Sequence, residues 1–528
     1  MWDAFGVGFM NQGLTPSIWV MTGLGVGIYL GGNLIWATIV SVVLAGIGFP
    51  IVWGVLGGSM PRSGGEYIYN SRILHPIVGI GESFGNAFVW IMWIYVLAPW
   101  FADPGMVMMG QFMGWEWLYD SANETFLGGL SYEWGSFVVA TLANVIAFLF
   151  VVFGIKWFAR IQKVVMVFGI GGCIVLLAAI SFYNQAEFKE GWNAIAAQYG
   201  SLDYDAFLAA VNAEVGTEMP TSWNWSDTLG VMVAGSWLFA YSYCITFIAG
   251  EVKRPDKTII LANLFAVLVP GAFMIWAGAA LYHMVPFDFF SASMYAENAG
   301  TDLEGAYTVP WPTHFLGLLA MVNQNKVILF ISVLSFWAFT LWWVALSYLA
   351  FPRIIFAWGM DRMGPKWFTD INPRFASPVK NHILCFVLGQ IMIAVYIFWN
   401  NETMQGLAVT ALEIFSVFGV TAIAALVFPY VKRARGIWDA SPYKTWRLLG
   451  IPVVTWGALV DLVYLGILAY YFFFMPDPAK RLEGFSRTTG YLIGITWLAG
   501  IVWYFFWKQR SKTVGVDVSM TYGELPPE

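Results

Sequence analysis

Few ionisable side chains lie within the long apolar runs of this sequence; Glu413, Asp461 and, at the start of the first run, Asp3 stand out. An ionisable side chain in a bilayer is costly and usually marks a functional site. Catalysis by acids, bases or metals would need several such groups close together. The apolar runs contain no His or Cys cluster and no paired aspartates at helical spacing. The sequence therefore predicts neither an enzyme nor a metal or cofactor site.

Two of the apolar runs are interrupted by polar residues. The first reads Phe9-Met10-Asn11-Gln12-Gly13-Leu14-Thr15-Pro16, where two amides, a glycine and a proline cannot continue a regular helix at low cost. The second, residues 237–246, carries hydroxyl groups at Tyr241, Ser242, Tyr243 and Thr246. Broken helices in matching positions of two halves are the best sequence indication of a transporter binding site. These hydroxyls could equally bond neighbouring helices, so the second run alone leaves both interpretations open.

The composition indicates what kind of element positions these residues. Hydrophobic residues make up 59% of the 528 residues and charged residues only 11%, against about 25% charged in soluble domains. This composition excludes a soluble enzyme, a disordered scaffold and a secreted disulfide-bonded module. A net charge of −6 gives no sign of nucleic-acid binding. We therefore predict an all-α integral membrane protein in the lipid bilayer.

A helix needs about 20 apolar residues to cross the hydrocarbon core. Twelve stretches qualify, of which the first is irregular and the third is interrupted by Asp103-Pro104-Gly105. The predicted spans are 3–25, 33–58, 84–113, 135–154, 161–183, 229–249, 259–282, 327–358, 383–399, 407–430, 450–474 and 490–507. The connections between them leave no room for a soluble domain.

The basic residues predict the orientation of these spans. With the N-terminus in the cytoplasm and alternating spans, 21 of the 26 Lys and Arg residues face the cytoplasm. The five that would face outward are Lys189, Lys326, Lys480, Arg481 and Arg487. The sequence therefore predicts a multi-pass protein of the plasma membrane with both termini in the cytoplasm.

Four motifs on the predicted cytoplasmic side resemble those of the amino acid–polyamine–organocation (APC) permeases. They occur in the order and spacing of that family, from residue 61 to residue 375. They are Pro61-Arg62-Ser63-Gly64-Gly65-Glu66-Tyr67, Gly154-Ile155-Lys156 with Ala159-Arg160-Ile161-Gln162, Gly250-Glu251-Val252-Lys253-Arg254-Pro255-Asp256-Lys257-Thr258, and Arg353-Ile354-Ile355-Phe356-Ala357-Trp358-Gly359-Met360-Asp361-Arg362 with Pro365 and Asn372-Pro373-Arg374-Phe375.

The resemblance implies a fold of five plus five inverted-repeat (LeuT-type) helices with two added C-terminal helices, discontinuous helices 1 and 6, and alternating access. Family substrates are mostly amino acids and related amines. The implied parts are a first repeat (1–183), an extracellular loop (184–228), a second repeat (229–431), spans eleven and twelve (432–507) and a cytoplasmic tail (508–528).

The resemblance also implies where a substrate would bind. Its carboxylate would meet free backbone N–H groups where span one unwinds, because the N-terminus of a half-helix carries positive partial charge. Its ammonium group would face carbonyl groups of span six, with Trp237 as a cap and Trp93 as a lining residue. The site residues assigned in this way are Asn11, Gln12, Gly13, Leu14, Trp90, Trp237, Phe239, Ala240, Tyr241, Ser242 and Tyr243.

Departures from the family pattern bear on the substrate. Asn11-Gln12-Gly13 replaces the usual Gly-Ser-Gly or Gly-Ala-Gly of span one, and Tyr241-Ser242-Tyr243 replaces a Gly-aromatic-Glu in span six. A second candidate break at 22–27 leaves too few residues before span two, so we place the break at 11–14. A cavity without a fixed carboxylate favours neutral or aromatic amino acids.

Three modes of coupling are compatible with the sequence. Sodium could bind the hydroxyls of Ser335 and Thr340 between spans one and eight, since hydroxyl and carbonyl oxygens suit a hard cation. A proton could bind Glu413, and exchange needs no ion. At the inner end of span six, Glu251, Lys253 and Arg254 are clustered closely enough to predict charge pairs that close a cytoplasmic gate.

A different class of function keeps the same fold. A non-transporting membrane subunit or solute sensor could have lost turnover. The long outer connection 184–228 could then dock a protein partner through aromatic side chains. These aromatic residues are Trp192, Tyr199, Tyr204 and Trp223.

Overall fold

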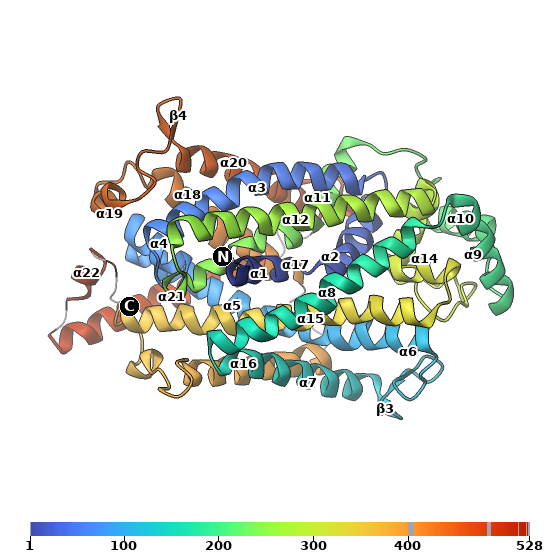
Figure 1. The fold of residues 1–528 in the computed structure, drawn as a ribbon, viewed down its shortest axis with the longest axis horizontal. Coiled ribbons are helices and arrows are strands. Elements are labelled where there is room, and N and C mark those ends of the chain that lie inside the picture. Colours follow the sequence, from blue (N-terminus) through green and yellow to red (C-terminus); the bar gives the residue numbers. More distant parts are fainter. Residues whose placement is uncertain (1, 400–405, 483–486, 516, 524, 526–528) are drawn as a thin grey trace.

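The structure, a computed structural model, describes residues 2–399, 406–482, 487–515, 517–523 and 525. Its helices run mostly along one direction and form an elongated bundle (Figure 1). Within the described residues, eleven helical segments are long and apolar enough to cross a membrane. This result confirms the prediction of an all-α, multi-pass membrane protein.

The first part of the chain runs from α1 to α10, with η denoting a π- or 3₁₀-helical segment. It contains α1 (Trp2–Asn11), α2 (Leu14–Val20), η1 (Met21–Val26), α3 (Leu34–Ser59), α4 (Glu66–Ile73), α5 (Pro76–Trp100), η2 (Phe101–Met106), α6 (Val107–Met113), α7 (Tyr132–Val152), α8 (Ile155–Ser181), α9 (Gln185–Tyr199) and α10 (Tyr204–Val215). A small antiparallel sheet lies between α6 and α7, with strands β1 (Tyr119–Asp120), β2 (Thr125–Phe126) and β3 (Leu130–Ser131) in that order.

The second part begins with α11. It contains α11 (Trp225–Phe239), η3 (Ala240–Phe247), η4 (Ala249–Glu251), α12 (Pro255–Met284), α13 (Phe287–Ala299), α14 (Phe315–Val322), α15 (Lys326–Met360), η5 (Lys366–Thr369), α16 (Val379–Trp399), α17 (Gly406–Glu413), η7 (Ile414–Gly419) and α18 (Val420–Val427). The last elements are η8 (Lys432–Ala434), α19 (Arg435–Ala440), the hairpin strands β4 (Arg447–Leu448) and β5 (Ile451–Pro452), α20 (Val453–Ala469), η9 (Tyr470–Phe474), η10 (Pro478–Lys480), α21 (Arg487–Thr513) and α22 (Val518–Thr521).

The first and third predicted spans are interrupted, as the sequence indicates. The predicted span 3–25 is divided into α1, α2 and η1, so no single helix of it has the length of a span. In the third span, Asp103 leaves the helical region with φ −127° and ψ 118°. The predicted start of that span, residue 84, is wrong. The helix begins at Pro76 and carries Glu82 fully buried.

The ends of the bundle differ in the elements that they carry. Figure 1 places α9, α10 and α14 at one end and α4, α19 and α22 at the other. The count of basic residues assigns the first of these ends to the outside and the second to the cytoplasm, and this sidedness stays a prediction.

The outer connection 184–228 is itself folded. A capping box of Asn184 and Glu187 starts α9. Trp192 is fully buried, and Tyr204 stacks on Phe289 of α13 with ring centroids 4.0 Å apart. The side chains of Trp192 and Tyr204 are therefore packed inside the folded connection. They are not available to dock a partner, contrary to the interpretation from sequence. Of the same set, Tyr199 and Trp223 remain exposed.

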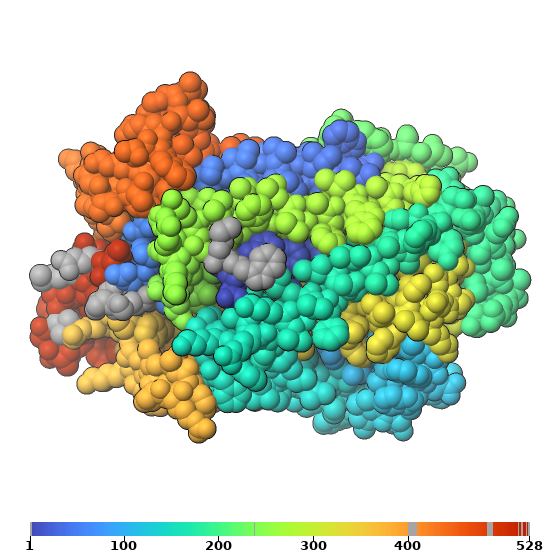
Figure 2. Space-filling view, in the orientation of Figure 1, coloured from blue at the N-terminus to red at the C-terminus, as the bar shows by residue number. Residues whose placement is uncertain are grey.

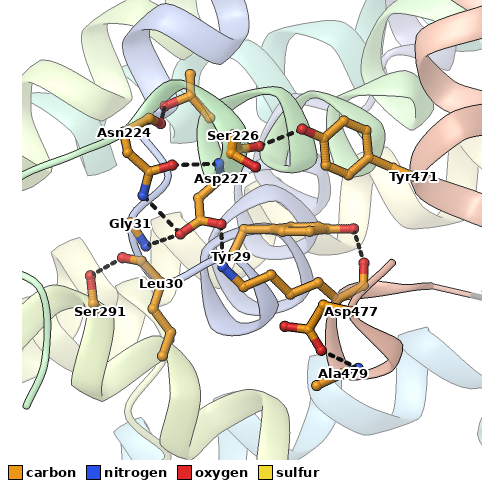
Figure 3. A network of polar contacts seen from close by, with 12 residues as sticks. Tyr29, Leu30, Gly31, Asn224, Ser226, Asp227, Ser291, Tyr471, Asp477 and Ala479 are labelled. Atoms are coloured by element: carbon orange, nitrogen blue, oxygen red, sulfur yellow. Dashed lines mark hydrogen bonds and ion pairs between the residues drawn. The ribbon is translucent and has the colours of Figure 1, made fainter. Parts of the chain in front are cut away.

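A network of polar contacts closes the outer end between distant parts of the chain (Figure 3). The carboxylate of Asp227, at the start of α11, accepts from Gly31 N at 3.1 Å and forms an ion pair with Lys480 at 2.5 Å. Tyr29 donates to the carbonyl of Lys480 at 2.7 Å. Ser291 of α13 donates to the carbonyl of Leu30, also at 2.7 Å. The segment after span one is thus bound to span six, α13 and the segment after span eleven.

A fully buried ion pair holds the opposite end together. Arg72 of α4 contacts both carboxylate oxygens of Asp361, the residue that caps α15, at 2.6 and 2.7 Å. Tyr67 donates to the same carboxylate at 2.6 Å, and its hydroxyl lies 3.2 Å from that of Tyr522 near the C-terminus. The side chains of Arg72 and Asp361 are both 0% exposed. Removing either partner would leave an unpaired charge in the core.

We expect Asp361→Ala to lower the free energy of unfolding by about 3–5 kcal/mol, because an uncompensated buried guanidinium remains. The measurement is thermal or denaturant unfolding of the purified protein in detergent. Asp439→Ala, which removes an exposed carboxylate paired with Lys444 at 2.8 Å, serves as the control and should unfold like the wild type. Equal stability of the Asp361 variant and this control would contradict the prediction.

Candidate functional site

The break in the first predicted span lies at Gln12-Gly13. Helix α1 ends at Asn11, Gly13 has φ 52° and ψ 67° in the left-handed region, and α2 begins at Leu14. This position confirms the predicted break at residues 11–14, and the alternative at 22–27 is a π-helical turn instead. The first N–H groups of a helix have no partner within that helix, so the start of α2 presents free donors at the break.

Span six also stops being α-helical where the sequence predicts a break. Helix α11 ends at Phe239, and the chain continues as the 3₁₀-helical segment η3. The eight residues of η3 are all buried. The sequence analysis expects an unwound segment here, and the structure has a change of helix type instead. This change still alters the direction of the carbonyl groups that follow Phe239. The side chain of Trp237, the predicted cap, lies outside the described residues.

The two interruptions are bonded to each other. The amide of Asn11 donates to the carbonyl of Tyr241 at 3.1 Å and contacts Cys244 Sγ at 2.9 Å. The side chain of Gln12 reaches the same segment, where the amide orientation that suits its neighbours accepts a hydrogen bond from Ser242 N at 2.9 Å. Asn11 and Gln12 therefore supply polar partners to span six inside the membrane-spanning region.

A tryptophan from span eight covers the break. Trp343 of α15 donates from Nε1 to the carbonyl of Asn11 at 2.6 Å. A Cβ atom on Gly13 would lie only 2.2 Å from the indole ring, so glycine is required both by φ and by this contact. The sequence analysis missed Trp343, because a tryptophan in an apolar run looks like ordinary packing.

A small cavity of about 30 Å³ lies beside the break, and its walls come from spans one, three, six and eight. Its lining residues are Asn11, Trp90, Trp93, Leu97, Tyr241 and Trp343. Among the described residues, the buried Trp90 Nε1 and Ser242 Oγ have no hydrogen-bond partner. The cavity is smaller than an amino acid, so aromatic side chains would have to move to admit one. The predicted site residues Asn11, Trp90 and Tyr241 do meet at one place.

Glu413 of α17 stands directly behind the cavity wall. Its carboxylate accepts hydrogen bonds from the hydroxyls of Tyr241 and Tyr243, the latter at 3.0 Å, and from Trp93 Nε1 at 3.3 Å. The side chain is fully buried. Two of its three donors belong to η3, so any movement of span six relative to span ten changes the hydrogen bonding of this carboxyl group.

The hydroxyls assigned to a sodium site are engaged within the protein. Ser335 donates to the carbonyl of Gly169 at 2.6 Å and lies 2.6 Å from Thr15 Oγ1. Thr340 donates to the carbonyl of Phe336, one turn back in its own helix, at 2.8 Å. The Thr340 bond is the ordinary arrangement of a threonine inside a helix.

The predicted gate residues border a larger cavity of about 550 Å³ near the N-terminus. Figure 2 shows dark blue atoms from the N-terminal part of the chain set back between α12 and α8. Glu251 pairs with Arg353 of α15 at 3.5 Å. Lys253 lines the cavity, and Arg254 caps α12 with φ 51°. Within the described residues neither Lys253 nor Arg254 has an ion-pair partner, so only Glu251 forms the expected charge pair.

Comparison with known proteins decides the family. The profile of the amino acid permease family matches residues 4–502. The chain belongs to the amino acid permease family. This permease is 25% identical over 232 residues to the cationic amino acid transporter 4, vacuolar, of Arabidopsis thaliana. It is 24% identical over 277 residues to the methylthioribose transporter of Bacillus subtilis.

These two alignments are partial. They cover 43% and 49% of the permease, and 34% and 54% of the respective relatives. The family membership agrees with the resemblance drawn from the four loop motifs.

We expect Gly13→Ala to destabilise the permease by roughly 1–2 kcal/mol from the left-handed backbone alone, with a further cost from displacing Trp343. Thermal unfolding and the tryptophan emission spectrum measure the two effects. Gly23→Ala is the matched control in the same span, because its Cβ atom would lie 3.6 Å from its nearest neighbour, Glu297 Cγ. An unchanged Gly13→Ala protein would show that neither constraint operates.

Proposed function

We propose that the permease is a secondary transporter that moves amino acids, neutral or aromatic ones in particular, across the plasma membrane by alternating access. The observation that carries the proposal is the pair of helix interruptions, at Gln12-Gly13 and at the start of η3, bonded through Asn11 beside an aromatic cavity. Helices broken at such places form the substrate sites of transporters.

The substrate would bind at the break in span one. Its carboxylate would take the N–H groups at the start of α2, at Leu14 and Thr15, where the helix dipole favours an anion; the N–H of Gly13 already donates to Met10 O at 3.3 Å. Trp343 covers this position and would have to swing aside. The ammonium group would face carbonyl groups of Phe239 and Ala240. Two further features of this binding mode are expected from the family: the inverted repeat, and Trp237 as a cap over the substrate.

The cavity wall supports a neutral or aromatic side chain. Four of its six lining residues are aromatic, and the carboxylate of Glu413 is separated from the cavity by Tyr241 and Trp93. Aromatic rings bind other aromatic rings and apolar surfaces. The vacuolar relative is named for cationic amino acids, so cationic amino acids are the competing substrates in any test.

We further propose proton coupling through Glu413. The hydroxyls of Tyr241 and Tyr243 favour the ionised carboxylate in the described conformation. Movement of η3 would withdraw both donors at once, and the buried carboxylate would then need a proton. Ser335 and Thr340 donate to backbone carbonyls, which leaves their oxygen lone pairs able to bind a cation, so sodium is the competing option in the test.

Uptake of radiolabelled amino acids into proteoliposomes tests both proposals. We expect an inward proton gradient, and not a sodium gradient, to drive accumulation. Glu413→Gln should lower the proton-driven rate by roughly tenfold or more, because a hydrogen bond to a charged group is worth about 1.5–3 kcal/mol and each tenfold corresponds to about 1.4 kcal/mol.

Asp461→Asn is the control for Glu413, since it neutralises another buried carboxyl group, in α20, and should leave uptake intact. Sodium-driven uptake, or full proton-driven uptake by the Glu413→Gln protein, would reject proton coupling. Saturable binding without any uptake would favour the alternative of a sensor or non-transporting subunit.

The gate at the predicted cytoplasmic end gives a separate prediction. Glu251→Gln removes the contact with Arg353 and should favour the inward-open state by about 1.5- to 5-fold, as expected for a partly exposed ion pair of about 0.2–1 kcal/mol. The readout is the labelling rate of a Val7→Cys variant, because Val7 lines the 550 Å³ cavity.

The matched control for Glu251 is Asp370→Asn, which breaks the exposed pair with Lys380 and should not alter labelling at position 7. Identical labelling with and without Glu251 would refute a gating role.

A further inference from the structure

A repeated sequence pattern lies on two packed helices at the end of the bundle that carries α4. Glu66 and Asn70 are four residues apart on α4, and Glu82 and Asn86 are four residues apart on α5. Residues at this spacing share one face of a helix. Helices α4 and α5 pack against each other, and all four side chains are buried, with exposures of 0–1%.

One of the two carboxyl groups is fully hydrogen-bonded. Trp53 of α3 donates to Glu66 Oε1 at 2.6 Å, and Asn86 donates to Glu66 Oε2 at 3.1 Å. The side-chain NH₂ group of Asn70 donates to the hydroxyl oxygen of Thr421 in α18 at 3.0 Å. Glu66 is thus the better hydrogen-bonded of the two carboxyl groups, since both of its oxygens accept a hydrogen bond, although burial still raises its pKa.

The other carboxyl group is less well hydrogen-bonded. Both oxygens of Glu82 are buried and form no hydrogen bond of good geometry among the described residues, and the same holds for Oδ1 of Asn70 and Oδ1 of Asn86. The side-chain amides of Asn70 and Asn86 lie close to Glu82. All four of these oxygen atoms are acceptors. A group of buried acceptors without well-placed donors costs several kcal/mol, and a proton on Glu82 would turn one of the four acceptors into a donor.

Few positive charges are available to compensate the two carboxyl groups. Helices α3, α5 and α18 contain no Lys or Arg, and the one basic residue of α4, Arg72, is held by Asp361 on both of its NH₂ groups. Helices α15 and α21, which also pack against α5, do carry Lys and Arg, but the side chains that act on Glu82 are Glu66, Asn70 and Asn86. Two ionised carboxylates on these packed helices would therefore repel each other without compensation in the described part of the chain.

We propose that Glu66 and Glu82 form a buried site that binds one proton, held as an O–H bond on Glu82 that donates to the amide oxygen of Asn70 or Asn86. On release the proton leaves the Glu82 oxygen for water, and both carboxyl groups are then ionised. In the proposed transport cycle, on which this role rests, the pair is the next proton site after Glu413 toward the predicted cytoplasmic end.

Contacts connect this pair to the candidate substrate site. Trp53, which donates to Glu66, has its ring centroid 5.4 Å from that of Tyr243, and Tyr243 donates to Glu413 at 3.0 Å. A change in protonation at Glu413 or at the Glu66–Glu82 pair therefore alters the surroundings of one residue, Tyr243 of η3.

The pH dependence of the pair has a defined sign. Burial raises the pKa of Glu66 from 4.5 to about 7, against hydrogen bonds from Trp53 and Asn86 that lower it. A carboxyl group with a raised pKa in the folded protein stabilises the fold below its unfolded pKa and loses that stabilisation as the pH rises through the folded pKa. The titratable groups that face Glu66 are Glu82 from α5, Glu413 from α17, Tyr69 from its own helix, and Tyr243 and Cys244 from η3.

Infrared difference spectroscopy of the purified full-length permease, titrated with acid and base, tests the site without any transport assay. We expect a protonated carboxyl C=O band that disappears as the pH rises and is absent from Glu82→Gln. Asp461 also has both oxygens buried without a hydrogen-bond partner among the described residues, so Asp461→Asn is the control: it removes any band of Asp461 and should keep the band assigned to Glu82. A band that is unchanged in Glu82→Gln would overturn the proposal, as would its loss on adding sodium chloride at constant pH.

Thermal unfolding provides the second readout. The midpoint of the wild type should fall between pH 4.5 and 7, and that of Glu82→Gln should change less over the same range, because glutamine is neutral and brings its own N–H donors. At pH 8 the variant should melt no lower than the wild type. A variant that melts lower at every pH, or with the same pH slope, would contradict a proton site. Absence of amino-acid uptake would reject the proposed function and leave both of these measurements valid.

Discussion

A membrane span that stops being α-helical part-way exposes backbone N–H and C=O groups, and hydrocarbon offers these groups no hydrogen-bond partner. The permease has two such interruptions, and it places them against each other so that side chains supply the missing partners. Asn11 reaches the carbonyl of Tyr241, and Trp343 reaches the carbonyl of Asn11. The packing of span eight against span one, the choice of glycine at residue 13 and the small size of the cavity all follow from this requirement.

The same requirement links several buried polar side chains to span six. The tyrosines of η3 satisfy Glu413, Trp53 lies against Tyr243, and Trp53 also satisfies Glu66. Buried polar groups are stable only when each has a partner, so the conformation of η3 is tied to the state of carboxyl groups on two other helices. In the proposed transport cycle, a change of shape at the substrate site would therefore be coupled to a change of charge behind it.

The sequence was sufficient for the parts of the structure that depend on local chemistry. Glycine and proline predicted the breaks near Gly13 and Asp103, and hydrophobic length predicted most of the spans. It was insufficient where tertiary contacts override local preference. Glu82 has the charge of a loop residue, yet it is buried because α4 and α5 enclose it. Trp343 is indistinguishable in sequence from the neighbouring Trp342, and only the fold shows which of the two faces the break.

The polar network around Asp227 has a consequence for how the segments that it joins can separate. It joins the segment after span one, the start of α11 and the segment after α20 through an ion pair whose carboxylate side chain is only 8% exposed. Salt screens such a buried pair far less than a surface pair. Moving these segments apart would require the contacts to separate together. The three segments therefore stay joined or come apart as one unit, and the loss of a single contact leaves the others in place.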